Sequence, residues 1–134
     1  MIVVNNDLEF DDEGDFDGDR VVIITGDPEL EEQLETVLFK EGIEAHSAAN
    51  IFDLGAIIYE RQPQLVIIDV AVGEVAIEAI TGAAKINAEV DFGILKIVRD
   101  PHFLGAHDSL GINFDPQTLL ERVRQLSKPY VVVA

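Results

Sequence analysis

Residues 63–69 read Pro-Gln-Leu-Val-Ile-Ile-Asp, and this stretch is the strongest indication of how the chain folds. Four apolar residues follow one another in it without polar alternation. Such a run is typical of a strand that is buried on both faces of a parallel sheet. In sheets of this kind, functional residues collect just outside the carboxyl ends of the strands. Asp69, which ends the run, is therefore the first candidate for a functional residue.

Length and composition indicate one domain with its own core. The chain has 134 residues, of which 48% are hydrophobic, and it contains no cysteine. The absence of cysteine excludes disulfides, thiolate metal sites and a cysteine nucleophile. The longest apolar runs have the length of strands, and the N-terminus has no basic, apolar region resembling a signal peptide. We therefore expect a soluble, cytoplasmic protein.

The charge is strongly acidic, and it is unevenly distributed. The formal net charge is −17, and eight of the 26 acidic residues lie in residues 1–19, which contain no base. Proteins bind nucleic acids and anionic membranes through clustered lysine and arginine. The charge therefore argues against both kinds of partner. A salt-loving source would explain the acidity equally well.

Strand-like and helix-like segments alternate along the chain. We expect strands near residues 20–25, 43–47, 65–69, 94–98 and 110–114, and helices near residues 28–40, 50–61, 74–86 and 116–127. Asp27-Pro28 and Asp115-Pro116 have the pattern of a capped helix start, with proline at the first helical position. This alternation predicts a doubly wound, five-stranded parallel sheet between two layers of helices, which is a three-layer α/β/α sandwich.

Three separate segments resemble the receiver domain of two-component response regulators. They are residues 22–28 (Val-Ile-Ile-Thr-Gly-Asp-Pro), residues 63–69, and residues 105–115 together with 119–123. The resemblance spans about residues 20–128 and keeps the order of the elements. It implies a flavodoxin/CheY-like fold and a role in signal transduction.

The resemblance also implies a set of functional positions, and Asp69 matches the one that accepts the phosphoryl group. The acidic pair that holds Mg²⁺ in active receivers falls on Thr25 and Gly26. Asp27 comes one place too late, although a slip of one residue would recruit it. A single carboxylate is a poor substitute for the pair, because Mg²⁺ requires several oxygen ligands.

Two further functional positions have lost their chemistry. The threonine or serine of active receivers falls on Val98, and the lysine falls on Ile112. An acyl phosphate gathers negative charge that only a metal and a cation can offset. With no cation evident nearby, we expect Asp69 to be weakly supported as an anion, to have a raised pKa, and not to be phosphorylated. We expect no metal and no cofactor; Mg²⁺ would bind only if Asp69 were active.

The segment after Val98 is shorter than the family requires. Only six residues separate Val98 from Gly105, where receivers place a loop and a helix. Pro101 also disfavours a helix there. The fourth helix of the family is therefore expected to be lost or shortened.

The two ends lie outside the resemblance. Residues 1–19 form an acidic extension that could hold a short strand at 2–4, and residues 129–134 form a β-prone extension. Because exposed apolar strands favour association, we expect at least one of these runs to be a strand. A homodimer through it is one arrangement that would cover it.

The sequence therefore predicts an atypical receiver-like domain that signals through protein–protein contact, without phosphorylation and without enzymatic turnover. A first alternative is a receiver that accepts a phosphoryl group at Asp69. A second alternative, from another class, is a flavodoxin-like protein that binds a small ligand. Against the second, the residues offer no glycine-rich phosphate loop and no Ser-His-Asp set.

Overall fold

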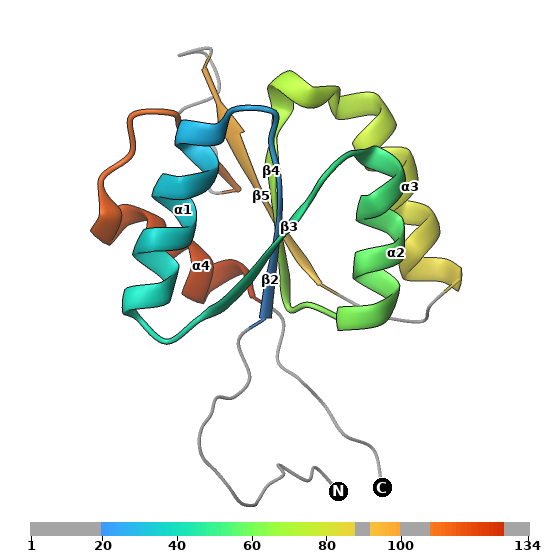
Figure 1. Ribbon diagram of the computed structural model, residues 1–134, viewed down its shortest axis with the longest axis horizontal. Coiled ribbons are helices and arrows are strands. Elements are labelled where there is room, and N and C mark those ends of the chain that lie inside the picture. The colour runs from blue at the N-terminus through green and yellow to red at the C-terminus, as the bar shows by residue number, and fades with distance from the viewer. Residues whose placement is uncertain (1–19, 88–91, 100–107, 128–134) are drawn as a thin grey trace, which may run out of the picture.

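Five parallel strands form the centre of the computed structural model, which describes residues 20–87, 92–99 and 108–127 (Figure 1). The strands are β2 (Arg20–Ile24), β3 (Glu44–Ala48), β4 (Leu65–Asp69), β5 (Gly93–Val98) and β6 (Ser109–Gly111). Their order in the sheet is β3-β2-β4-β5-β6. The order reverses its direction between β2 and β4, which is where doubly wound sheets place their sites.

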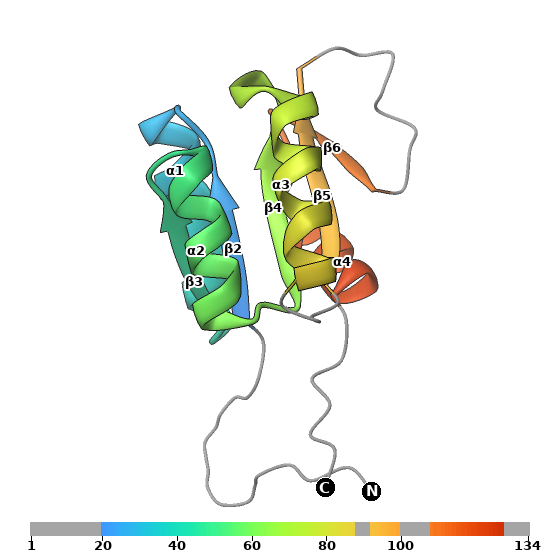
Figure 2. The ribbon, with the colours of Figure 1, turned by 90° about the vertical axis from the view of Figure 1, so that its right-hand side faces the viewer.

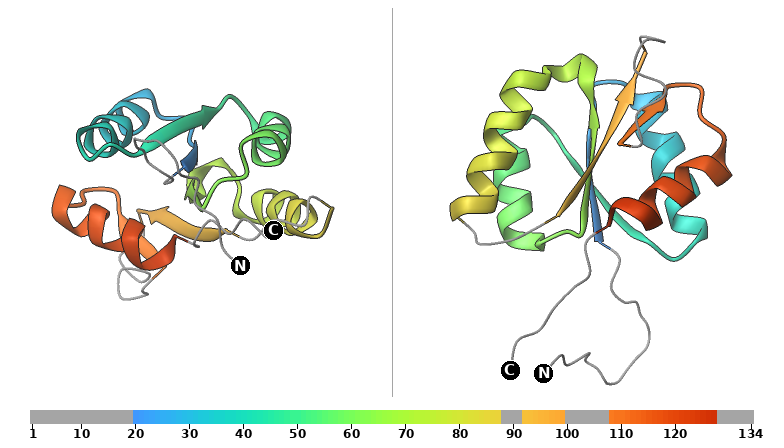
Figure 3. Two further views of the ribbon diagram at one scale, coloured as in Figure 1. Left: turned by 90° about the horizontal axis from the view of Figure 1, so that it is seen from below. Right: turned by 180° about the vertical axis from the view of Figure 1, so that it is seen from behind.

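Helices cover both faces of the sheet. They are α1 (Pro28–Lys40), α2 (Ile51–Arg61), α3 (Glu74–Asn87) and α4 (Pro116–Leu126), and a short 3-10 helix, η1, spans Val70–Val72. Helices α1 and α4 lie on one face, and α2 and α3 lie on the other (Figures 1 and 3). The predicted three-layer α/β/α sandwich is confirmed.

The strands contribute to two separate cores, which explains the unbroken apolar runs in the sequence. Alternate residues of β4, Leu65 and Ile67, pack in the core beneath α1 and α4. Val66 and Ile68 pack in the core beneath α2 and α3. All five residues of β4 are buried, as expected for a central parallel strand. Figure 2 shows this strand between its neighbours.

The predicted helix starts are confirmed. The Asp27 carboxylate accepts hydrogen bonds from the backbone N–H groups of Glu29 and Leu30, and it thereby caps α1. Asp115 caps α4 in the same way. These local bonds satisfy N–H groups that would otherwise have no partner at the helix ends.

Two details differ from the sequence prediction. The last strand, expected at residues 110–114, ends at Gly111, because the chain then turns toward the start of α4. The 3-10 helix η1 was not predicted. It follows directly from Asp69, whose carboxylate caps it by accepting a hydrogen bond from the Ala71 N–H group.

Some predictions concern residues outside the described ranges. The terminal runs at 1–4 and 130–134 lie there, and so does most of the segment after Val98 in which the fourth receiver helix was expected to be lost. The terminal strands and a homodimer through them stay predictions. Within the described ranges, the helices are all too short or too polar to cross a membrane.

Candidate functional site

Asp69 lies at the carboxyl end of the central strand, and its side chain is almost completely buried. Its exposed fraction is 2%. The strand pairs with β2 on one side and β5 on the other, so that residues following all three strands converge at this edge. A buried carboxylate is stable only if hydrogen bonds or an opposite charge replace its water.

Each oxygen of the Asp69 carboxylate accepts two hydrogen bonds. Oδ1 accepts from the Ala71 N–H group at 3.0 Å and from Nη1 of Arg99. Oδ2 accepts from the Thr25 hydroxyl at 2.7 Å and from Nη2 of Arg99 at 3.2 Å. The Arg99 guanidinium thus approaches the carboxylate in the bidentate geometry that makes arginine–carboxylate pairs strong.

Arg99 also joins Asp69 to a second acidic residue. Its Nη2 lies 3.7 Å from Oδ2 of Asp27, whose other oxygen caps α1. The N–H group of Asp27 donates to the Thr25 hydroxyl at 3.1 Å, and that hydroxyl in turn donates to Asp69. One guanidinium and one hydroxyl therefore link the ends of β2, β4 and β5 into a closed network.

The network determines the charge state of Asp69. Burial by itself would raise the pKa of Asp69, but hydrogen bonds from Arg99, Thr25 and the Ala71 N–H group outweigh it, and the pKa lies below its ordinary value. The hydrogen bond to Asp69 raises the pKa of Arg99 in turn. The predicted raised pKa is therefore wrong: Asp69 is a well-supported anion.

The expectation that no cation lies near Asp69 is also wrong. Arg99 comes directly after β5, one place beyond Val98, the position that the resemblance had marked. Parallel pairing sets Asp69 opposite Ile97, two residues before Arg99, so that the long arginine side chain can reach back to the carboxylate. A basic residue immediately after the strand next to Asp69 was the signal that could have found it.

The other predicted positions lie at the same edge of the sheet. Thr25 follows β2 and contacts Asp69, whereas Gly26 is exposed beside it. Val98 is buried at the end of β5, and its carbonyl accepts from the N–H group of Ile112 at 2.9 Å. The Ile112 side chain packs against the core beneath α1 and α4, so it offers no charge to the site.

The residues that the structure describes at this edge do not fit Mg²⁺. Among the described residues, no group of three or more histidine, aspartate or glutamate side chains could hold a metal ion. Asp69 and Asp27, the carboxylates that the described residues bring to this edge, both face the Arg99 guanidinium. A tethered cation thus lies between the acidic groups that a metal would have to join.

Comparisons with known proteins give a structural likeness only. No protein-family model and no curated protein match the sequence. The fold, by contrast, matches many solved structures at a high probability.

Several of the matching structures are response regulators or their receiver domains. A response-regulator receiver domain from Bermanella marisrubri has a TM-score of 0.68 at 22% identity, over 80% of this chain and 96% of that chain. The chemotaxis response regulator CheY4 of Vibrio cholerae has a TM-score of 0.66 at 17% identity, over 80% and 97%. The beryllofluoride-activated receiver domain of Klebsiella pneumoniae RstA has a TM-score of 0.65 at 19% identity, over 81% and 97%.

The five-stranded parallel sheet and its two helix layers place the chain among the doubly wound α/β proteins. Within that class, its fold is that of the CheY-like receiver domains of response regulators. At these identities the likeness concerns the fold, and function has to be argued from the site.

Proposed function

We propose that this chain is a receiver-like signalling module that acts by protein–protein contact, without phosphorylation of Asp69 and without catalytic turnover of its own. The observation that carries the proposal is the Arg99 guanidinium, which pairs with both oxygens of the Asp69 carboxylate. The receiver fold supports a place in signal transduction, and the cytoplasm is the proposed location.

A carboxylate that attacks a phosphoryl donor needs an oxygen with a free lone pair and a path to the donor. Each oxygen of Asp69 already accepts two hydrogen bonds, and the exposed fraction of the residue is 2%. The low pKa also lowers the nucleophilicity of the carboxylate. Attack would therefore require Arg99 to leave first, at the cost of stranding a buried charge.

The surroundings also oppose the product of such an attack. An acyl phosphate would add negative charge beside Asp27, and metal coordination normally offsets it. Val98 and Ile112 supply neither a hydroxyl nor an ammonium group to the phosphoryl oxygens. Among the described residues, Arg99 is the cation that pairs with both acidic side chains, and it would have to balance the new charge as well.

Protein is the class of partner that the surface supports best. The net charge of −17 disfavours phosphate backbones and anionic lipid. With Asp69 held in one charge state, the module would signal by being bound rather than by being modified.

The test uses the full chain with Mg²⁺ and either beryllofluoride or acetyl phosphate. We expect unchanged amide resonances around Asp69 and no protein mass increase corresponding to a phosphoryl group. A receiver that retains the acidic pair, the threonine and the lysine serves as the positive control. A stoichiometric adduct, absent from an Asp69→Asn variant, would replace this proposal with the phosphoaccepting alternative.

A further inference from the structure

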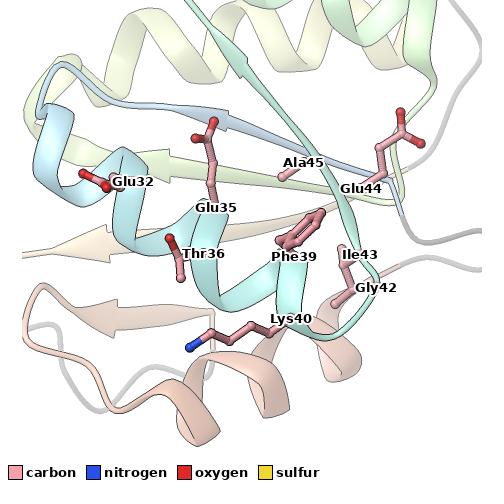
Figure 4. Close-up of a pocket in the computed structure, with 9 residues that line it drawn as sticks. All are labelled: Glu32, Glu35, Thr36, Phe39, Lys40, Gly42, Ile43, Glu44 and Ala45. Carbon is pink, nitrogen blue, oxygen red and sulfur yellow. The ribbon is translucent and has the colours of Figure 1, made fainter.

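A hollow of about 860 Å³ lies between α1 and the edge strand β3, and its lining includes no residue of the Asp69 network (Figure 4). The side chains of Glu32, Glu35 and Phe39 line it from α1, and Glu44 and Ala45 line it from the strand. Figure 4 shows Phe39 and Glu35 on the side of α1 that faces β3.

Of the two edges of the described sheet, strand β3 is the more open. Among the described residues it pairs with β2 alone, over all five of its positions. The opposite edge, β6, has only three residues, and the Ser109 carbonyl there accepts a hydrogen bond from Nη1 of Arg122 at 2.6 Å. An edge strand presents backbone N–H and C=O groups that can pair with another chain.

The hollow also exposes a large apolar side chain next to this edge. Phe39 is 82% exposed, although the neighbouring Leu38 is completely buried. A single exposed apolar residue is ordinary on a protein surface. An exposed ring in a hollow beside an open backbone edge is what a strand-binding groove requires, because backbone pairing gives affinity and side-chain pockets give specificity.

The charges of the hollow indicate the chemistry of the occupant. Three glutamates, Glu32, Glu35 and Glu44, line it against one base, Lys40. The Ser47 hydroxyl donates to the Glu35 carboxylate at 2.7 Å, which holds that carboxylate over β3. A second copy of this chain would bring the same glutamates into the contact, and like charges placed opposite each other destabilise a strand pair.

We propose that this hollow binds an extended, basic segment of a partner protein, which adds a strand to the open edge of β3. An apolar side chain of the segment packs on Phe39, and its lysine or arginine side chains pair with Glu32, Glu35 and Glu44. The inference rests on the proposed function as a protein-binding module and names the surface and the partner chemistry. It does not involve Asp69.

The test is a titration of the full, isotope-labelled chain with a blocked peptide of alternating lysine and valine at physiological salt. We expect saturable amide shifts concentrated in residues 32–39 and 44–48. The Phe39→Ala variant should bind about tenfold more weakly, because the ring then no longer buries apolar area. Phe52→Ala is the matched control, since Phe52 is 87% exposed on α2, and it should bind as the wild type does.

A second pair of variants tests the charge. Glu32→Lys in the hollow should weaken binding several-fold more than Glu121→Lys on α4, although both change the net charge equally. If both variants lose the same peptide affinity, or if the amide shifts spread over the whole acidic surface, the peptide binds only by non-specific electrostatic attraction. Either result would overturn the proposal.

Two further outcomes would also overturn it. Shifts in β3 that depend on protein concentration without peptide would assign the edge to a second copy. Peptide binding that appears only after residues 129–134 are deleted would assign it to the chain's own C-terminal run. A phosphoryl adduct at Asp69, by contrast, would refute the proposed function while leaving peptide binding at β3 intact, so that the two failures can be distinguished.

Discussion

Replacing Arg99 with methionine tests the network around Asp69 most directly. The change removes two of the four hydrogen bonds to a carboxylate that is 2% exposed. Removing one partner of a fully buried ion pair costs about 3–5 kcal/mol. The Arg99 side chain is 39% exposed, so solvent screens part of that cost. We therefore expect a loss of about 2 kcal/mol in the free energy of unfolding at pH 7.

The loss should depend on pH with a definite sign. The folded-state pKa of Asp69 lies below the ordinary value of an aspartate, which the unfolded chain keeps. Its network therefore contributes stability that is fully present above the unfolded pKa and is lost as the pH falls through the folded pKa. Arg99 contributes the largest of the influences that lower this pKa, so the pKa of Asp69 should be higher in the variant than in the wild type. The difference in stability between the wild type and the variant should thus be smallest in acid and grow to a plateau toward neutral pH.

Urea unfolding of both proteins between pH 3 and pH 7 measures this difference. Arg124→Met is the matched control, because Arg124 forms an ion pair with Glu41 at 3.5 Å while its side chain is 60% exposed. We expect the control to change stability by less than about 0.5 kcal/mol. An Arg99→Met penalty that is the same at every pH would show that the side chain acts through packing. A penalty no larger than the control's would refute the ion pair itself.

Two other predictions concern the sheet. Gly93→Ala should lower the free energy of unfolding in urea by about 3 kcal/mol, because the new Cβ atom would lie 1.8 Å from the backbone carbonyl oxygen of Leu126. Gly82→Ala is the control: a Cβ atom there has nothing within 4 Å, so the change should be neutral or slightly stabilising. An equal effect of both changes would contradict the close packing of β5 on α4. Thr25→Val should lower the free energy of unfolding by about 1–2 kcal/mol and raise the pKa of Asp69, because Oδ2 of Asp69 loses a hydrogen-bond donor. An NMR titration of the Asp69 carboxyl measures this pKa, and an unchanged pKa would show that the hydroxyl does not support the charge.

The architecture could be predicted because its signals are local. The uninterrupted run in residues 65–68 requires apolar surroundings on both sides, and the two cores of the structure supply them. Asp27 and Asp115 specify helix starts through bonds to residues only two or three places away. Interactions of such short range can be recognised without knowing where the rest of the chain lies.

The site was predicted only in part, and the reason is geometric. Asp69 could be located because its position follows from one strand, and Thr25 because it directly follows the first strand, Arg20–Ile24. Arg99, 30 residues further along the chain, pairs with Asp69 because the parallel register of β4 and β5 brings it close enough for its long side chain to reach the carboxylate. The resemblance to receivers pointed instead to Val98, the residue directly before Arg99.

This missed contact also reversed the electrostatic prediction. Burial of a carboxylate raises its pKa, and from the sequence that was the only influence in view. The folded chain brings a guanidinium, a hydroxyl and a backbone N–H group to the same two oxygens, and their sum lowers the pKa. The sign of such a shift depends on distances of about 3 Å, which only packing sets.

The sequence by itself determined the order of strands and helices, their capped starts, and an acid at the end of the central strand, because each depends on residues that are close in the chain. Only the tertiary structure decided that Arg99 pairs with this acid and that, within the part of the chain that the structure describes, β3 pairs on one side only, next to an exposed Phe39. Both depend on how the strands align and on which side chains this alignment brings together, and neither is encoded at any one place along the chain.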